Sequence, residues 1–426
     1  MLAPVLALGL SAGAASPQAA DVLRGAPLHY DAPATAGLVE RVGRRLESGD
    51  LKLAFDPDAG YLPALLDALE IPVSTQILVF SKTSFQSERI SPAAPRAIFF
   101  GDAAYVGSIP GAPLVEITSI DPERGPVFYT LEQDAERAPR FVRRHDECLQ
   151  CHAISHTYGW PGNLVRSVHP DRTGRPILSS GTELVTHATP FEKRWGGWYV
   201  TGTHGDARHR GNAIADVETE MVDPEAGANI EDLAQYFDTD RYLSPHSDIV
   251  ALMVFEHQAE MQNRIARAGY EVRIALYRQA EVNRIFGDPP GTLRGSTARI
   301  LKSQAKKLLE TMLLETEIRL PAPIVGTSGF AAEFTARGRC DERGRSLRDL
   351  DLAERLFRYP CSYLVHSPEF DELPAELLEV VYRDLWTILS TAADGGEPAR
   401  LAAPDRTAIL EILLATKDGL PAYWRS

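Results

Sequence analysis

The pentapeptide Cys148-Leu149-Gln150-Cys151-His152 constrains this chain more than any other feature. Cys-x-x-Cys-His is the attachment signature of c-type haem, in which two thiols bond the two vinyl groups of one porphyrin. The histidine that follows is then held under the iron as its proximal ligand. Because the chain has only 4 Cys and 11 His among 426 residues, chance rarely produces this pattern. We therefore expect one haem c, held by Cys148 and Cys151 and ligated by His152.

Two other kinds of site use closely spaced cysteines. A structural zinc site needs two further ligands, usually from a second Cys-x-x-Cys, whereas Cys340 and Cys361 stand alone. A thioredoxin-type redox pair calls for a strand-to-helix context, which we do not expect around this motif. Both alternatives therefore fit less well than haem.

The first 20 residues form an apolar run followed by small residues, which is typical of a signal peptide. No positive charge precedes the run, so a disordered Ala-rich tail is the alternative. Since c-type haem is attached outside the cytoplasm, we predict an exported, periplasmic protein with no membrane span in the mature chain. Export would also permit a disulfide between Cys340 and Cys361. The alternative is that both cysteines remain unpaired.

The periodicity of the hydrophobic residues and the positions of Gly, Pro and Asp predict an α+β fold. Five β-rich segments punctuated by Gly, Pro and Asp predict a mostly antiparallel N-terminal sheet, accompanied by short helices at 36–48 and 61–69. The segments are 75–81, 96–100, 105–109, 114–120 and 127–131. Helical patterns at 248–268, 296–318 (with Ser296 as N-cap), 374–389 and 405–416 predict a helical C-terminal half. We place the regions at 24–139 (α/β), 140–215 (haem-binding) and 230–426 (helical), after a signal peptide at 1–20.

The stretch 140–212 differs in composition from the rest of the chain. It holds seven of the 11 His and three of the 5 Trp, and ten Lys and Arg against six Asp and Glu. The whole chain, by contrast, carries a formal charge of −14, which argues against nucleic acid as a partner. Frequent Gly and Pro predict a loop-rich wrap with one short strand near 198–201, as a bulky planar cofactor requires.

The second axial position of the iron decides much of what such a centre can do. A strong sixth ligand suits electron transfer, whereas an open position admits small molecules. We favour His204 as the distal ligand because Gly202 and Gly205 would let the backbone pass close to a flat ring. His187 and His257 are the next candidates, and an open site is a further alternative.

The positive charge of this stretch could serve to bind the two haem propionates, because arginine pairs with carboxylates bidentately. The candidates for this role are Arg143, Arg144, Arg166 and Arg194. Trp198 is the tryptophan that we expect against the ring.

Several segments resemble a family of large bacterial proteins with one c-type haem motif and no assigned reaction. The resemblance is carried by segments 79–87, 147–152, 164–168, 194–205 and 359–363, and it extends over about residues 74–390. It implies export, covalent haem at Cys148 and Cys151, and ligation by His152, and it implies no catalytic residues. The chain differs from small class I cytochromes c, whose motif lies near the start of a compact helical domain.

Three functions remain open. The first is electron transfer with a donor or acceptor protein. The second is a haem enzyme acting on peroxide or another small molecule, with His187 or His209 as an acid–base group. The third is a haem-based sensor in which ligand exchange moves the helical region. We favour the first.

Overall fold

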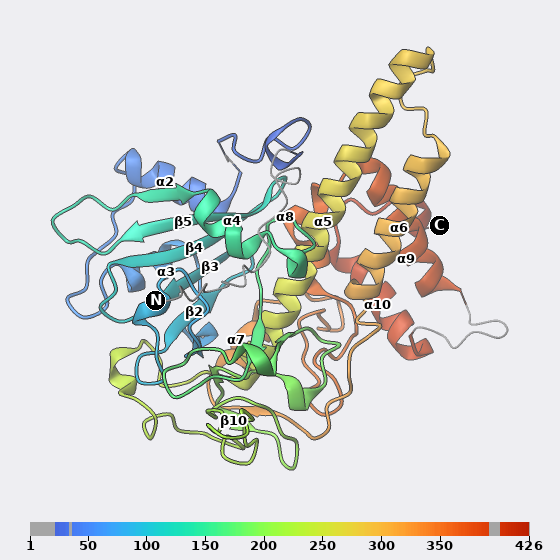
Figure 1. The fold of residues 1–426 in the computed structure, drawn as a ribbon. Coiled ribbons are helices and arrows are strands. Elements are labelled where there is room, and N and C mark those ends of the chain that lie inside the picture. Colours follow the sequence, from blue (N-terminus) through green and yellow to red (C-terminus); the bar gives the residue numbers. More distant parts are fainter. Residues whose placement is uncertain (1–21, 34–35, 392–400, 426) are drawn as a thin grey trace, which may run out of the picture.

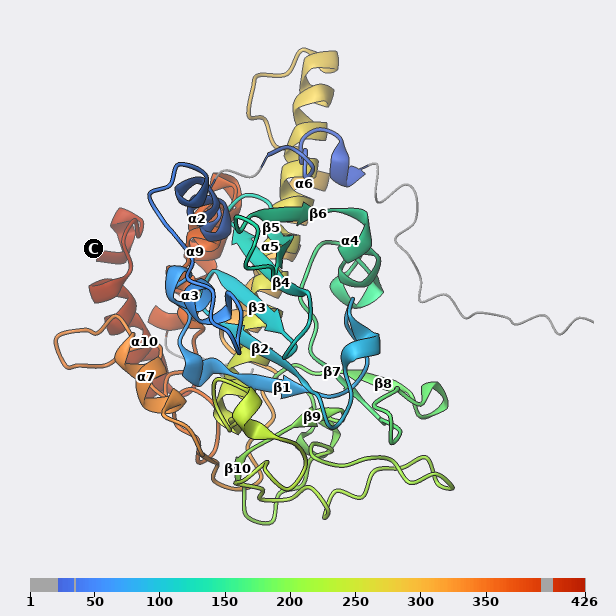
Figure 2. The ribbon, with the colours of Figure 1, turned by 90° about the vertical axis from the view of Figure 1, so that its left-hand side faces the viewer.

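The computed structural model describes residues 22–33, 36–391 and 401–425, so the predicted signal peptide lies outside the described residues. Seven antiparallel strands form the main sheet, in the spatial order β6-β5-β4-β3-β2-β1-β9 (Figures 1 and 2). They are β1 (Ile77–Val79), β2 (Arg96–Phe100), β3 (Ala104–Ser108), β4 (Leu114–Asp121), β5 (Gly125–Glu132), β6 (Phe141–Arg144) and β9 (Trp198–Tyr199). The first five coincide with the five predicted strands, and the predicted mostly antiparallel sheet is confirmed.

Two small ribbons accompany this sheet. β7 (Arg166–Val168) pairs with β8 (Thr182–Leu184), and β10 (Gly202–Thr203) pairs with β11 (Val325–Gly326). The intervening chain between 145 and 248 consists mostly of turns and loops, as expected from its Gly and Pro content. β9 was predicted as a short strand, and the structure adds that it extends the main sheet beside β1.

Two hydrophobic layers sandwich the sheet. On one face, helices α2 (Leu38–Glu47) and α3 (Leu62–Ala68) pack against alternate strand residues such as Phe99 and Val106. On the other face, Phe100 and its neighbours meet the long helix α5. This second core continues into the C-terminal helices, and the predicted α+β class is therefore confirmed.

The remaining helices are α4 (Asp146–His152), α5 (Ile249–Phe286), α6 (Gly295–Met312), α7 (Phe330–Ala336), α8 (Pro368–Asp371), α9 (Ala375–Ser390) and α10 (Ala403–Thr416). α5 begins where Asp248 accepts hydrogen bonds from the first-turn amides, and it runs 18 residues beyond its predicted end at 268. The extra turns were missed because they project from the body and present several exposed apolar residues instead of one buried stripe.

α6 corrects two details of the prediction. Its cap position is Arg294, and Ser296 lies inside the helix without capping it. The helix ends at Met312 instead of 318, because Leu314 takes a left-handed backbone conformation that a helix cannot continue through. Cys340 is exposed and Cys361 is buried, and both are free thiols in the structure.

Candidate functional site

The Cys-x-x-Cys-His motif folds as helix α4, which follows strand β6 after one residue. On a helix, positions three and four residues apart share a face, so Cys148, Cys151 and His152 are neighbours. All three line one cleft between α4 and the sheet, which encloses about 1360 Å³ of space including its mouth to solvent. The geometry thus offers two thiols and one imidazole to the same cleft.

The expectation that no strand leads into the motif was wrong, because β6 does so. The surroundings still differ from those of a thioredoxin-type pair. The sheet is antiparallel, and burial raises the pKa of the Cys148 thiol to about 11, whereas a redox-active nucleophile needs a lowered pKa.

Two rows of residues, each running across the strands, form the floor of this cleft. One row pairs Ile98, Gly107, Glu116 and Thr130 in successive strands, and the other pairs Tyr105, Thr118, Phe128 and Arg144. Because alternate residues of a strand point to the same face, these rows present their side chains together. The sheet therefore walls one side of the cleft that the two thiols line.

Gly107 leaves room in this floor for a neighbouring cation. A Cβ atom at this position would lie 2.2 Å from the Arg96 guanidinium, which crosses the strand to pair with Glu116 at 2.6 Å. Arg96 lines the cleft but was not among the predicted residues. Arg96 shares a face of β2 with Ile98, but no signal in the sequence indicates that this face borders the motif.

His152 is oriented by its partner Gly162. The imidazole Nδ1–H donates to the Gly162 carbonyl at 2.8 Å, and the Gly162 amide donates back to the His152 carbonyl at 2.9 Å. Burial lowers the pKa of His152, so the ring is neutral. With the proton on Nδ1, the lone pair lies on Nε2, which no protein group engages in the described part of the chain. Iron-ligating histidines are held in this way.

Helix α5 holds the loop that carries Gly162. The Asn263 side chain accepts from the Asn163 amide at 2.9 Å and donates to the Asn163 carbonyl at 2.7 Å. A Cβ atom on Gly162 would lie 2.6 Å from the Asn263 Oδ1, so only glycine fits there without movement. Asn263 therefore positions the acceptor of His152 from a helix about 100 residues away in sequence, and no local sequence signal indicates this.

Two of the four predicted propionate partners lie in the cleft. Arg144 and Arg166 line it, and Arg166 retains donors beyond its contact with Thr182 at 3.4 Å. Arg144 donates to Thr130 at 3.0 Å and lies 4.0 Å from the Glu147 carboxylate, which is a loose ion pair. Trp198 lines it as well, and its indole N–H donates to the Arg166 carbonyl at 2.7 Å.

The other two arginines have structural partners outside the cleft. Arg143 donates to the carbonyls of Tyr30 and Ala32. Arg194 is 3 % exposed and pairs with the buried Glu256. We therefore withdraw both from the set of propionate partners, because their guanidinium groups are already engaged by the protein.

The distal candidates also lie outside the cleft, in a buried group that we call the histidine core (His187, His204, His209, His257, Arg194 and Glu256). His204 uses both ring nitrogens, since Nδ1 donates to Ala207 at 2.7 Å and Nε2 accepts from the Asn229 amide at 3.0 Å. The Nε2 of His187 lies 3.1 Å from the Thr316 hydroxyl, and that of His257 lies 2.8 Å from the Ser362 hydroxyl.

The prediction of His204 as distal ligand therefore does not fit this geometry, and the same holds for His187 and His257. Among the described residues that line the cleft, His152 is the only histidine and there is no methionine. The described residues also contain no cluster of three or more His, Cys, Asp or Glu able to hold a metal ion by itself. A c-type haem needs no such cluster, because the porphyrin supplies four of the ligands.

No known protein family, curated protein or solved structure matches the chain. Within residues 22–33, 36–391 and 401–425, every helix is too short or too polar to cross a membrane.

Proposed function

We propose that this chain is a periplasmic c-type cytochrome that carries one covalent haem and exchanges single electrons with a partner protein. The observation that supports this is the arrangement of Cys148, Cys151 and His152 on one face of α4, all lining the same cleft. Bound there, haem would supply one-electron exchange at its iron.

Different residues of the cleft would contact different parts of a bound haem. The two thiols anchor it, and the Nε2 of His152 is available to iron while Gly162 fixes the ring. Arg144 and Arg166 have guanidinium donors to offer to propionates. The ring of Phe128, whose centroid is 4.6 Å from that of His152, would shield the imidazole from water.

A second candidate function is redox chemistry on a small molecule. It is favoured by one observation, that the described lining of the cleft offers no histidine or methionine opposite His152. An iron with a vacant second axial position can bind a small molecule, and Tyr105 and Thr118 are among the polar residues that line the cleft.

Absorption spectra of the purified protein, with and without carbon monoxide, separate the two candidates. A low-spin reduced spectrum that carbon monoxide leaves unchanged would support electron transfer and exclude the open site. A high-spin ferric spectrum with carbon monoxide binding would favour the second candidate. A protein that loses all its haem on denaturation would refute both.

A further inference from the structure

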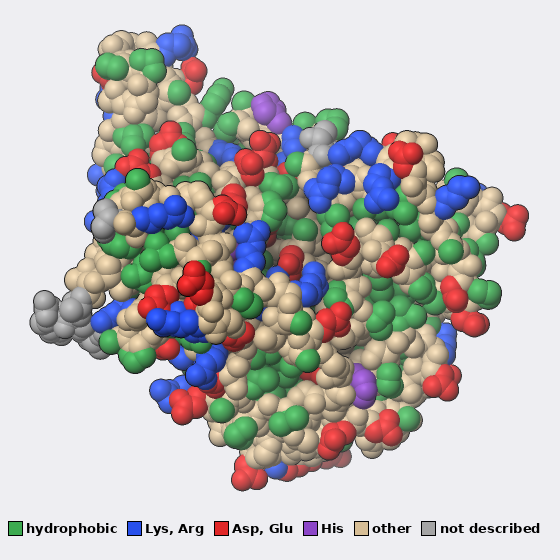
Figure 3. All heavy atoms as spheres, turned by 180° about the vertical axis from the view of Figure 1, so that it is seen from behind, with side chains coloured by type: hydrophobic (Ala, Val, Ile, Leu, Met, Phe, Trp, Pro, Cys, Tyr) green, Lys and Arg blue, Asp and Glu red, His purple; other side chains and the backbone are tan. Residues whose placement is uncertain are grey.

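The second half of α5 and the start of α6 form a helical hairpin that projects from the body of the molecule (Figures 1 and 2). Ile285, Phe286 and Leu293 lie at its tip and are 70 %, 68 % and 43 % exposed. Hydrophobic and charged side chains are visible together on this projection (Figure 3). Such a concentration of exposed apolar residues on a soluble protein indicates an interaction site.

The hairpin is basic in an acidic protein. Residues 274–310 contain seven Lys and Arg and three Asp and Glu, a net charge of +4, whereas the whole chain carries −14. Four of these cations form no side-chain ion pair or hydrogen bond with any described residue. They are Arg278, Arg299, Lys302 and Lys307. Arg299 and Lys302 are three residues apart on α6 and therefore lie on the same side of it.

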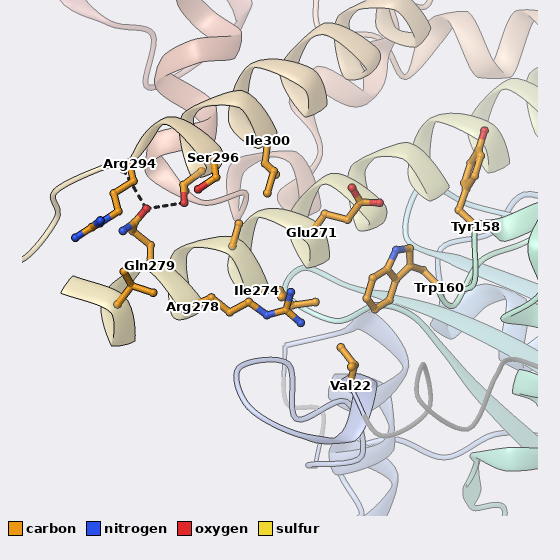
Figure 4. Close-up of a pocket in the computed structure, with 13 residues that line it drawn as sticks. Val22, Tyr158, Trp160, Glu271, Ile274, Arg278, Gln279, Arg294, Ser296 and Ile300 are labelled. Carbon is orange, nitrogen blue, oxygen red and sulfur yellow. Dashed lines mark hydrogen bonds between the residues drawn. The ribbon is translucent and has the colours of Figure 1, made fainter. Parts of the chain in front are cut away.

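The apolar surface continues from the tip towards the body. A groove enclosing about 1470 Å³, including its open mouth, runs along the hairpin past Ile300, Val282 and Ile274 to Trp160. Figure 4 shows the unpaired Arg278 extending along this groove beside Ile274. The groove thus combines an aliphatic wall, an indole ring and a free cation.

We propose that this hairpin docks the protein on an anionic phospholipid bilayer, with the apolar tip in the interface and the cations against lipid phosphates. Basic helices with exposed apolar residues bind membrane surfaces in this way. We favour a lipid surface over a protein partner because the exposed apolar residues are gathered at the tip of the hairpin and the unpaired cations lie along its two helices. The proposal does not depend on the bound haem.

The test is co-sedimentation of the full-length protein with vesicles of phosphatidylglycerol and phosphatidylcholine (1:1) and with phosphatidylcholine alone. We expect binding to the anionic vesicles only, and its loss in 0.5 M salt. The quadruple variant R278Q/R299Q/K302Q/K307Q should weaken binding by about a hundredfold or more, since each cation near the surface contributes about a factor of five. The variant I285S/F286S/L293S should weaken it at least about tenfold.

Matched controls lie on the body of the molecule. R89Q/R140Q/R172Q/R425Q removes four exposed cations, and L178S/V217S removes exposed apolar residues, so neither variant should alter binding. In F286W, lipids with brominated chains should quench the new tryptophan's fluorescence. Failure to bind anionic vesicles would overturn the proposal, as would binding that both hairpin variants retain. Self-association that replaces vesicle binding and is lost in the quadruple variant would instead assign the hairpin to a second copy of the chain.

Discussion

The cleft beside α4 and the histidine core contain the same kinds of side chain, and the structure uses them differently. In the cleft, His152 has one ring nitrogen bonded and one available, and Arg144 and Arg166 face open space. In the histidine core, both nitrogens of His204 are bonded and Arg194 is paired with a buried carboxylate. Other ring nitrogens of the histidine core, such as Nε2 of His209, have no hydrogen-bond partner but are buried. The two regions therefore differ in whether their polar atoms face open space, and residue type alone does not reveal this difference.

The largest expected effect concerns the thiols of the cleft. In C148A/C151A no thioether can form, so covalent haem should be lost completely, as judged by a haem stain after denaturing electrophoresis. C340A/C361A removes the other two cysteines and should keep the stain. If C148A/C151A kept its haem after denaturation, the cleft beside α4 would not be the site of covalent attachment.

Replacing an arginine should cost much more unfolding free energy in the histidine core than in the cleft. R194A leaves Glu256 buried without its cation and should lower the free energy of unfolding by about 3–5 kcal/mol. R166A removes a side chain whose hydrogen bond to Thr182 is long, and it should cost under about 1 kcal/mol. Urea titrations of both variants measure this, and equal losses would contradict the comparison.

The histidine core should also respond to acid. Burial lowers the pKa of His209 to about 3, far below its unfolded value near 6.5. The unfolded chain therefore takes up a proton as the pH falls below 6.5, while the folded chain does not. The free energy of unfolding should then fall by about 1.4 kcal/mol for each pH unit below 6.5. Between pH 6.5 and 4.5 the wild type should lose roughly 2.5 kcal/mol more than H209Q, measured by urea unfolding. If the free energies of unfolding of the wild type and of H209Q change with pH in the same way, His209 is not buried as a neutral ring.

A pair of asparagines allows a matched test of positioning. N263A removes the clamp on the 162–163 loop, which should cost about 1–2 kcal/mol of stability and raise the reduction potential, because a looser Gly162 carbonyl makes His152 less electron-rich. N212A removes comparable bonds to the backbone of Val200, outside the 162–163 loop, and should leave the potential unchanged. Equal potentials in both variants would mean that Asn263 has only a structural role.

The smallest expected effect is spectroscopic. H204A should leave the spin state of the haem unchanged, since both ring nitrogens already have protein partners outside the cleft. A shift from low to high spin in this variant would restore His204 as the distal ligand and refute its assignment to the histidine core.

The sequence predicted the sheet well because its strands are short, β-branched and bounded by turns, so local pattern and fold agree. Of the residues that the sequence suggested for the site, Trp198, Arg144 and Arg166 line the same cleft as the motif. The sequence could not rank the histidines, because the partners of His204 and His187 come from residues 25 and 129 positions away. Asn263 was missed for the same reason, since its role depends on how α5 packs against the 162–163 loop.

One consequence of the unbroken helix α5 concerns distance. Asn263 and Phe286 are 23 residues apart on this helix, which corresponds to about 35 Å at 1.5 Å per residue. The helix is thus a spacer that sets the clearance between the projecting tip and the cleft. If the tip rests on a bilayer, a redox partner lying flush with that bilayer is out of reach. The electron partner would then be a diffusing protein, or a membrane protein whose exposed domain stands about as tall as this helix.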